Sequence, residues 1–178
     1  MIKSIENKFK KLELQRVAIF EEINGLDAHL FNQKPSAEAW SVAQICVHLM
    51  QAEVGSLNYL KKKVSHTTQI PNAGVKSWFR SKTVWFYLNL PIKIKAPAIL
   101  EELPKSSNFI DIQNNWASQR LDLQEFLTLC PDRLAVSEIW KHPLAGKMNI
   151  AQMLDFFYWH SKRHHGQIRR TLEKIREN

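Results

Sequence analysis

The chain has 178 residues, a length that suits one domain with a sizeable core, and we expect a single domain over residues 1–178. Apolar residues make up 44% of it, which excludes an intrinsically disordered protein, and no apolar run approaches the roughly 18 residues of a membrane span. The net charge is +8, and two cysteines without an apolar export signal favour a reduced, cytoplasmic protein.

The first predicted helix runs from about Lys3 to Leu26. Its apolar residues recur at steps of three and four, with lysine and glutamate between them: Ile5, Phe9, Leu12, Ile19 and Ile23. Asn24-Gly25 is the first stop signal, although the apolar pattern continues to Leu30 and Phe31. A connector that contains Pro35 follows.

The second predicted helix, over about residues 41–63, begins with a clear N-terminal signature. Ser41 is a natural N-cap, and Gln44 three residues later completes a capping box. Trp40 before the cap and Ile45 after it have the spacing of a hydrophobic staple. This signature fixes where the helix starts.

The third predicted helix spans about Asn108 to Leu129, and the fourth about Ile150 to Arg176. The entrance of the fourth, Met148 to Met153, repeats the residue types that open the second. Four amphipathic helices predict an all-α fold, a four-helix bundle. Residues 64–107 are long enough to run back along the bundle between the second and third helices, so we predict an up-down-down-up order with a long crossover insert.

The stretch of residues 60–107 holds nine Lys/Arg and two acids, a net charge of +7. Aromatic residues lie within it: Trp78, Phe79, Trp85, Phe86 and Tyr87. We favour a solvated, ordered loop with an aromatic underside, and a short extra helix fits Trp78 to Leu90. Nucleic-acid binding through phosphates and stacking is the less favoured interpretation. A basic rim would also attract anionic substrates.

Three of the seven histidines fall on the inward side of predicted helices: His48, His160 and His164. His160 and His164 are four residues apart, so a helix places them on one face, although such a pair alone is a weak signal. Imidazoles inside a bundle need partners for their polar nitrogens, and one divalent metal ion would satisfy three of them. His165 is about 100° round the helix from His164 and is excluded from this set.

Several other polar residues have both a possible structural role and a possible functional role. Arg120 interrupts the apolar stripe of the third helix, and a buried ion pair is favoured over a role in a pocket. Glu53 is expected to be a surface or interhelical charge. Gln167 suits a contact to the ligand shell and exposure to solvent equally well. Cys46 and Cys130 are expected to be inert structural thiols.

Two segments resemble a known family. Residues 40–49, WSVAQICVHL, are similar to the second-helix segment of the DinB/YfiT-like superfamily, and residues 160–168, HSKRHHGQI, to its fourth-helix segment. The resemblance implies a four-helix bundle with a divalent metal ion held by three histidines, here His48, His160 and His164. It also implies transferases or isomerases that use low-molecular-weight thiols such as bacillithiol, mycothiol or glutathione. The doubled histidine at 164–165 and the long basic insert depart from the family pattern.

The leading hypothesis is therefore a metal-binding protein, a metalloenzyme of thiol-dependent S-transferase or hydrolase type with an open three-histidine site. Zn²⁺, Ni²⁺ and Fe²⁺ all accept nitrogen ligands, and a low-molecular-weight thiol would be the cosubstrate. The expected partner is a small, anionic substrate, with a homodimer as a further option and neither nucleic acid nor a membrane expected. The alternatives are a non-enzymatic interaction or stress-response module and a basic nucleic-acid-binding bundle.

Overall fold

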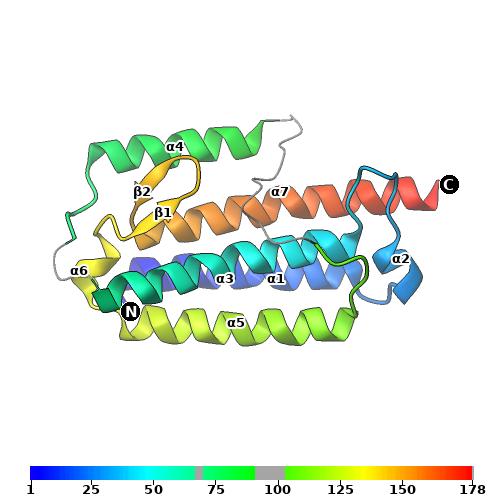
Figure 1. Ribbon diagram of the computed structural model, residues 1–178, viewed down its shortest axis with the longest axis horizontal. Coiled ribbons are helices and arrows are strands. Elements are labelled where there is room, and N and C mark those ends of the chain that lie inside the picture. The colour runs from blue at the N-terminus through cyan, green and yellow to red at the C-terminus, as the bar shows by residue number, and fades with distance from the viewer. Residues whose placement is uncertain (67–69, 91–102, 178) are drawn as a thin grey trace.

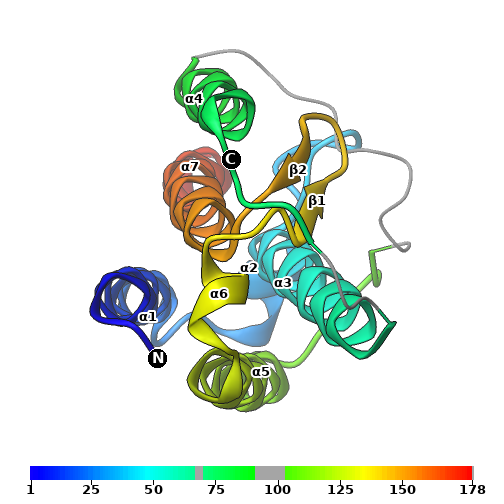
Figure 2. The same ribbon diagram turned by 90° about the vertical axis from the view of Figure 1, so that its left-hand side faces the viewer.

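Four long helices carry the apolar stripes that the sequence predicts: α1 (Lys3–Ile23), α3 (Val42–His66), α5 (Phe109–Leu129) and α7 (Ile150–Arg176). The computed structural model describes residues 1–66, 70–90 and 103–177. These helices lie side by side in both views (Figure 1, Figure 2), so the predicted, mostly helical fold is confirmed. Within the described ranges, no helix is both long and apolar enough to cross a bilayer.

Reciprocal side-chain caps start the two helices that hold the candidate ligands. Ser41 Oγ accepts the backbone N–H of Gln44 at 3.2 Å, and Gln44 Oε1 accepts the backbone N–H of Ser41 at 3.1 Å. Asn149 and Gln152 make the same pair of bonds at the start of α7, at 2.8 and 2.9 Å. Both predicted capping boxes are confirmed, and they fix the register of α3 and α7.

The first helix is shorter than predicted. It ends at Ile23, because the chain turns at Gly25, whose φ of +79° is a left-handed conformation that favours glycine. The apolar residues that follow belong to a separate short helix, α2 (Ala28–Asn32), and Asp27 caps it by accepting the N–H of Leu30 at 2.8 Å. The continued apolar pattern therefore marks a second helix.

The connection between α5 and α7 contains structure that the sequence did not reveal. It holds a short helix, α6 (Asp132–Ala135), and an antiparallel hairpin of β1 (Trp140–His142) and β2 (Gly146–Met148). Trp140 lies opposite Met148, and both side chains are buried. Strands of three residues are too short to show an alternating pattern, so they could not be predicted from the sequence.

The predicted extra helix in the insert is confirmed as α4 (Val75–Asn89). It packs against α7 and β2 on the outside of the bundle (Figure 1, Figure 2). The expected aromatic underside is wrong for Phe79 and Phe86, because both side chains lie on the outer surface. Other parts of the predicted insert, residues 67–69 and 91–102, lie outside the described residues.

The buried apolar residues form two clusters along the bundle. One cluster takes Leu12 of α1 and Leu57 of α3, together with Phe157 near the start of α7. The other takes residues further along α1 and nearer the start of α3, with Ile168 of α7. The two clusters are therefore separated by about two turns on α1, α3 and α5 and by about three turns on α7.

Polar side chains lie in the middle of the bundle, between the two clusters or next to them, and we call this set the central polar layer. Its members come from all four long helices: Glu13, Gln15, His48, Glu53, Arg120, His160, His164 and His165. Polar groups away from water are costly unless they are hydrogen-bonded or paired. The polar groups of this layer must therefore find hydrogen-bond or charge partners inside the protein for the bundle to be stable.

One half of this layer is a charged network that joins α1, α3 and α5. Arg120 donates from Nε and Nη2 to the two carboxylate oxygens of Glu53, both at 2.7 Å. Its Nη1 donates to Glu13 at 3.0 Å, and Trp116 Nε1 donates to Glu53 at 3.0 Å. Arg120 and Glu53 are only 2% and 5% exposed. The ion pair favoured for Arg120 is confirmed, and Glu53 is an interhelical charge.

Replacing one partner of this pair should strongly destabilise the bundle. Glu53→Gln leaves the guanidinium of Arg120 buried without its main counter-charge, and we expect the free energy of unfolding to fall by about 3 kcal/mol. Urea denaturation followed by circular dichroism measures this. The double variant Glu53→Leu/Arg120→Met should be less destabilised than the single one, because no uncompensated charge remains. Equal losses in both variants would contradict the assignment.

Candidate metal centre

Three imidazoles converge in the other half of the central polar layer. His48 comes from α3, and His160 and His164 come from consecutive turns of α7. The Nε2 atom of His160 lies 3.1 Å from the Nε2 atoms of both His48 and His164. One ring nitrogen from each residue lies within 4.8 Å of the other two, and all three side chains are buried. The structure thus brings together the three histidines singled out in the sequence.

The spacing of these nitrogens fits a common metal ion. Histidine nitrogens bound to one ion at 2.0–2.1 Å would lie about 3–3.5 Å apart, which matches the two separations of 3.1 Å. Without a cation the arrangement of the three Nε2 atoms is unfavourable. A proton on one nitrogen makes a hydrogen bond between His160 and either His48 or His164, and lone pairs of the remaining nitrogens then face one another. The donor set therefore suits a divalent ion that prefers nitrogen ligands.

Gln167 orients one of the rings. His164 Nδ1–H donates to Gln167 Oε1 at 2.8 Å, so the lone pair of His164 is on Nε2, which faces His160. Orientation of a metal-binding histidine through its second nitrogen is common in metal sites. The open interpretation of Gln167 is settled in favour of contact with the histidine cluster. On His48, by contrast, Nδ1 is buried and finds no hydrogen-bond partner in the described part of the chain.

Burial keeps these imidazoles neutral. It lowers the pKa of His48 to about 4. It also lowers the pKa of His164 to about 3, with a further contribution from the neighbouring His48. The pKa of His160 lies well below 6.5, first through burial and then through repulsion by His164 and His48. Neutral imidazole is the form that binds metals, so protons do not compete for the site near pH 7.

Aromatic rings wall the cluster on two sides. Trp40 lies with its ring centroid 4.9 Å from that of His48 and stacks on His164 at 6.2 Å. Phe156 stacks on His160 at 5.1 Å with an interplanar angle of 13°. Neither role was predicted: Trp40 appeared only as a helix staple, and no periodic signal sets Phe156 apart. These rings shield the nitrogens from water and restrict the orientation of the imidazoles.

A fourth buried histidine lies close to the cluster and was not predicted to do so. His142 of β1 packs edge-on against Phe156, with centroids 4.7 Å apart. Its Nδ1 accepts the backbone N–H groups of Leu144 and Ala145 at 3.2 and 3.1 Å, which places its proton on Nε2. It stabilises the hairpin turn and is separated from His160 by the Phe156 ring.

His165 points away from the cluster, as its angular position on the helix predicts. Its Nδ1 lies 2.9 Å from Gln15 Nε2, and its Nε2 lies 3.6 Å from a carboxylate oxygen of Glu22. Both partners belong to α1. His165 therefore joins α7 to α1, although it is as buried as His164.

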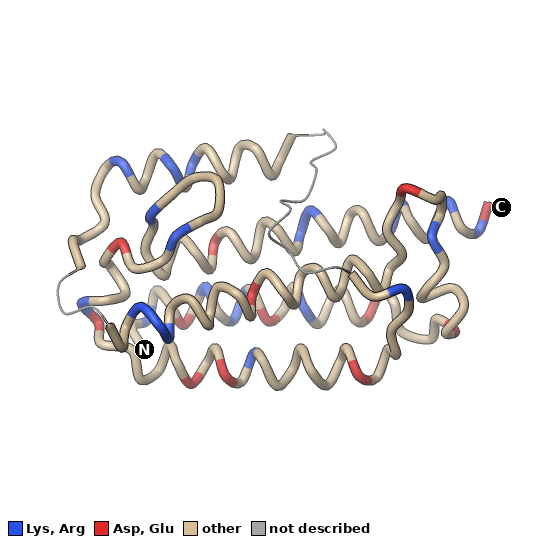
Figure 3. The backbone as a smooth tube through the Cα atoms, in the orientation of Figure 1, with Lys and Arg blue, Asp and Glu red and all other residues tan. Residues whose placement is uncertain are grey.

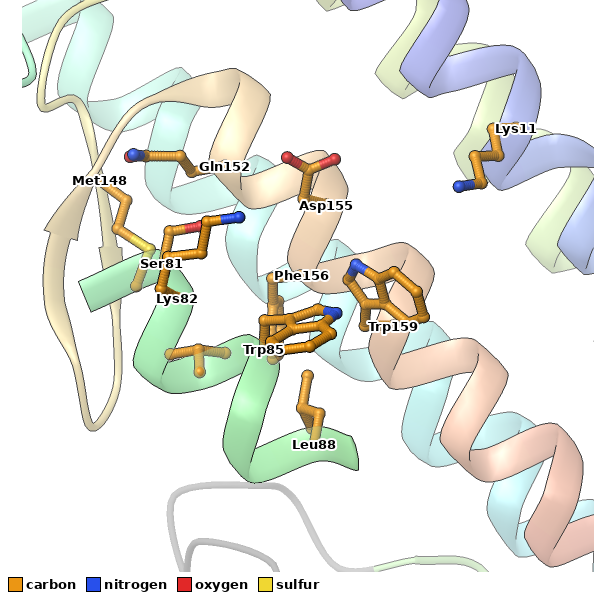
Figure 4. Close-up of a pocket in the computed structure, with 11 residues that line it drawn as sticks. Lys11, Ser81, Lys82, Trp85, Leu88, Met148, Gln152, Asp155, Phe156 and Trp159 are labelled. Carbon is orange, nitrogen blue, oxygen red and sulfur yellow. The ribbon is translucent and has the colours of Figure 1, made fainter. Parts of the chain in front are cut away.

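A cavity of about 360 Å³ lies near the histidine cluster, and Phe156, which stacks on His160, forms part of its wall. It lies between α4 and α7, with Lys11 reaching it from α1 (Figure 4). None of the three clustered histidines lines it. The lining residues combine two lysines, two tryptophans and several other apolar and polar groups: Lys11, Ser81, Lys82, Val84, Trp85, Leu88, Met148, Gln152, Asp155, Phe156 and Trp159.

The buried imidazoles should make the metal-free protein less stable in acid. Burial lowers the pKa of His142 to about 4, so the unfolded chain takes up a proton as the pH falls below about 6.5 while the folded chain does not. The free energy of unfolding therefore decreases from pH 6.5 towards pH 4. His142→Asn keeps an acceptor for the turn and removes this titration. We expect a flatter pH profile for this variant in urea unfolding with a chelator present; profiles parallel to the wild type would contradict the assignment.

Comparison with known proteins gives a family match and a similar bacterial protein. The DinB superfamily matches residues 11–168. The chain is also similar to the uncharacterized protein YuaE of Bacillus subtilis (strain 168), at 29% identity over 164 residues, which cover 90% of this chain and 94% of that protein. The matched range contains all three clustered histidines as well as α4 and the hairpin. The chain therefore belongs to the DinB superfamily.

Proposed function

We propose that this protein binds a divalent metal ion through His48, His160 and His164 and acts as a metalloenzyme. The proposal rests on one observation above all, the approach of three neutral, buried imidazoles to within 4.8 Å of one another. Membership of the DinB superfamily supports it. A metal ion is the partner that satisfies all three facing nitrogens at once.

Three protein ligands leave positions open on the metal, which is typical of catalytic sites and not of closed structural ones. Zn²⁺, Ni²⁺ or Fe²⁺ would fit the nitrogen donors. The bound ion would supply Lewis-acid chemistry that lowers the pKa of a water or thiol ligand. We infer a thiol-dependent S-transferase or a hydrolase, with a low-molecular-weight thiol as cosubstrate in the first case.

We propose further that the substrate is a small anion that binds in the neighbouring cavity. Two lysine ammonium groups, from Lys11 and Lys82, reach its edges, whereas its one carboxylate, Asp155, is already paired with Lys8. Trp85 and Trp159 offer apolar surface, with ring centroids 6.1 Å apart (Figure 4). The ring of Phe156 both lines this cavity and stacks on His160.

We infer that the helices form one domain, a bundle of up-down-down-up order. The colour gradient in Figure 1 supports this order, since α1 and α7 run in one direction and α3 and α5 in the other. A cytoplasmic location is part of the same proposal. Both cysteines are free thiols, which is the usual state in a reducing compartment.

Loss of any one ligand should remove most of the bound metal. We expect untagged wild-type protein to bind about one ion per chain, whereas His48→Ala, His160→Ala and His164→Ala each leave only two of three ligands. Elemental analysis after purification without chelator, and equilibrium dialysis against Zn²⁺, measure this. His165→Ala is the matched control, because it removes an equally buried histidine that faces α1. Full stoichiometry in all three ligand variants would disprove the site.

Gln167 should influence metal affinity without contacting the metal. Gln167→Leu removes the acceptor that orients His164, and we expect roughly tenfold weaker metal binding. Gln167→Glu keeps an acceptor for Nδ1–H and should bind metal at least as tightly as the wild type. Competition with a chromophoric chelator compares the two variants. Equal affinities for Leu and Glu at this position would show that the hydrogen bond has no such role.

A further inference from the structure

Helix α4 presents an aromatic outer face that none of the described residues covers. Val75, Phe79 and Phe86 are 72%, 60% and 59% exposed, and Trp78 is 52% exposed. Large apolar side chains are usually exposed singly, and a contiguous group of them marks an interaction site. Figure 2 shows α4 at the periphery of the molecule, with α7 and the hairpin on its inner side.

The exposed residues share one side of the helix. Positions 75, 79, 82 and 86 follow one another at steps of three and four, which places them on a single face. The two buried residues of α4, Ser77 and Val84, lie on the roughly opposite face and point into the protein. The outward face of the helix is therefore mostly apolar, in addition to Val84 and Leu88, which line the cavity on its inner side.

The charge of α4 is entirely positive. It carries Lys76, Arg80 and Lys82 and has no acidic residue, as Figure 3 shows. Arg80 is engaged within the protein, 3.7 Å from Glu138 and hydrogen-bonded to the carbonyl of Lys147. Lys76 and Lys82 are exposed, and the ammonium of Lys82 lies 5.6 Å from the ring centroid of Trp78. Cations beside exposed aromatic rings are the composition of helices that lie in a membrane interface.

We propose that α4 docks the protein on the surface of an anionic lipid bilayer. Phe79, Phe86 and Trp78 enter the boundary between headgroups and acyl chains, and Lys76 contacts the anionic headgroups, while Lys82 stays at the rim of the cavity between α4 and α7. Lysine side chains can extend their ammonium groups to the headgroups while their stems stay in apolar surroundings. Docking of this kind needs no spanning helix, and it leaves the histidine cluster inside the bundle.

Other occupants fit the face less well. Two copies that met through α4 in a two-fold contact would bring like charges together with no acid on the helix to neutralise them. Helix α5, which carries acidic residues, lies on the opposite side of the bundle from α4 (Figure 3). A contact between α4 of one molecule and α5 of the next would therefore repeat into an open chain of molecules. Nucleic acid requires a track of cations, whereas this face carries one lysine, Lys82, among Val75, Phe79 and Phe86.

Vesicle flotation tests the proposal on the full chain. Untagged protein is mixed with phosphatidylcholine vesicles with or without phosphatidylglycerol. We expect flotation with the anionic vesicles, weakening as salt screens the headgroups, and little with the neutral ones. Absence of binding to anionic vesicles at low salt would overturn the proposal.

Matched variants test whether vesicle binding depends on α4 or on exposed apolar side chains in general. Phe79→Ser/Phe86→Ser should reduce the vesicle-bound fraction roughly tenfold or more. Leu121→Ser/Leu129→Ser is the control, because it removes two exposed leucines from α5 on the far side and should leave binding unchanged. An equal loss in the control would overturn the proposal.

A charge variant and two further measurements complete the test. Lys76→Glu keeps the aromatic face and the cavity-lining Lys82, and it should weaken the preference for anionic vesicles severalfold. It serves as the independent test if the serine variant fails to fold by circular dichroism. Light scattering that finds a dimer dissociated by the α4 changes, or single-stranded DNA binding without vesicle binding, would overturn the proposal in favour of a second copy or nucleic acid.

Discussion

The central polar layer is the constraint on which the rest of this structure depends. Two apolar clusters would make an ordinary bundle, but every long helix carries polar side chains at the level between them. Glu53 and Arg120 neutralise each other on one side of the layer, with two carboxylate–guanidinium bonds of 2.7 Å. The histidines on the other side have no comparable partner among the described residues. This asymmetry separates the structural half of the layer from the half available for a ligand.

Helix α7 links almost every feature of the candidate site. Its capping box fixes the register, so that His160 and His164 face α3 while His165 faces α1. The same helix supplies Phe156, whose ring borders both His160 and the neighbouring cavity. A shift of one residue in this register would move the imidazoles by about 100° and separate them from His48. The local capping chemistry at Asn149 is therefore a condition for the geometry of the cluster.

Periodicity and capping signals in the sequence were sufficient to predict the long helices. They also predicted that three histidines, carried by two of those helices, approach one another. The same signals placed His165 on the side of α7 that faces α1, away from the other two histidines. The sequence could not reveal the hairpin with His142, because three-residue strands have no readable period. Nor could it predict the stacking of Phe156 on His160, which depends on packing between distant elements. For α4 the pattern predicted a helix but not its orientation, because aromatic and basic residues suit either a buried or an exposed face.

The position of α4 has a consequence for how such proteins diverge. It lies outside the four long helices, and Val84 is its only fully buried apolar side chain. Mutations on its outer surface therefore do not disturb the layer that holds the histidines. Substitutions can therefore accumulate on this surface while the geometry of the histidine cluster is kept. The fold thus separates an evolutionarily adaptable exterior from a constrained interior.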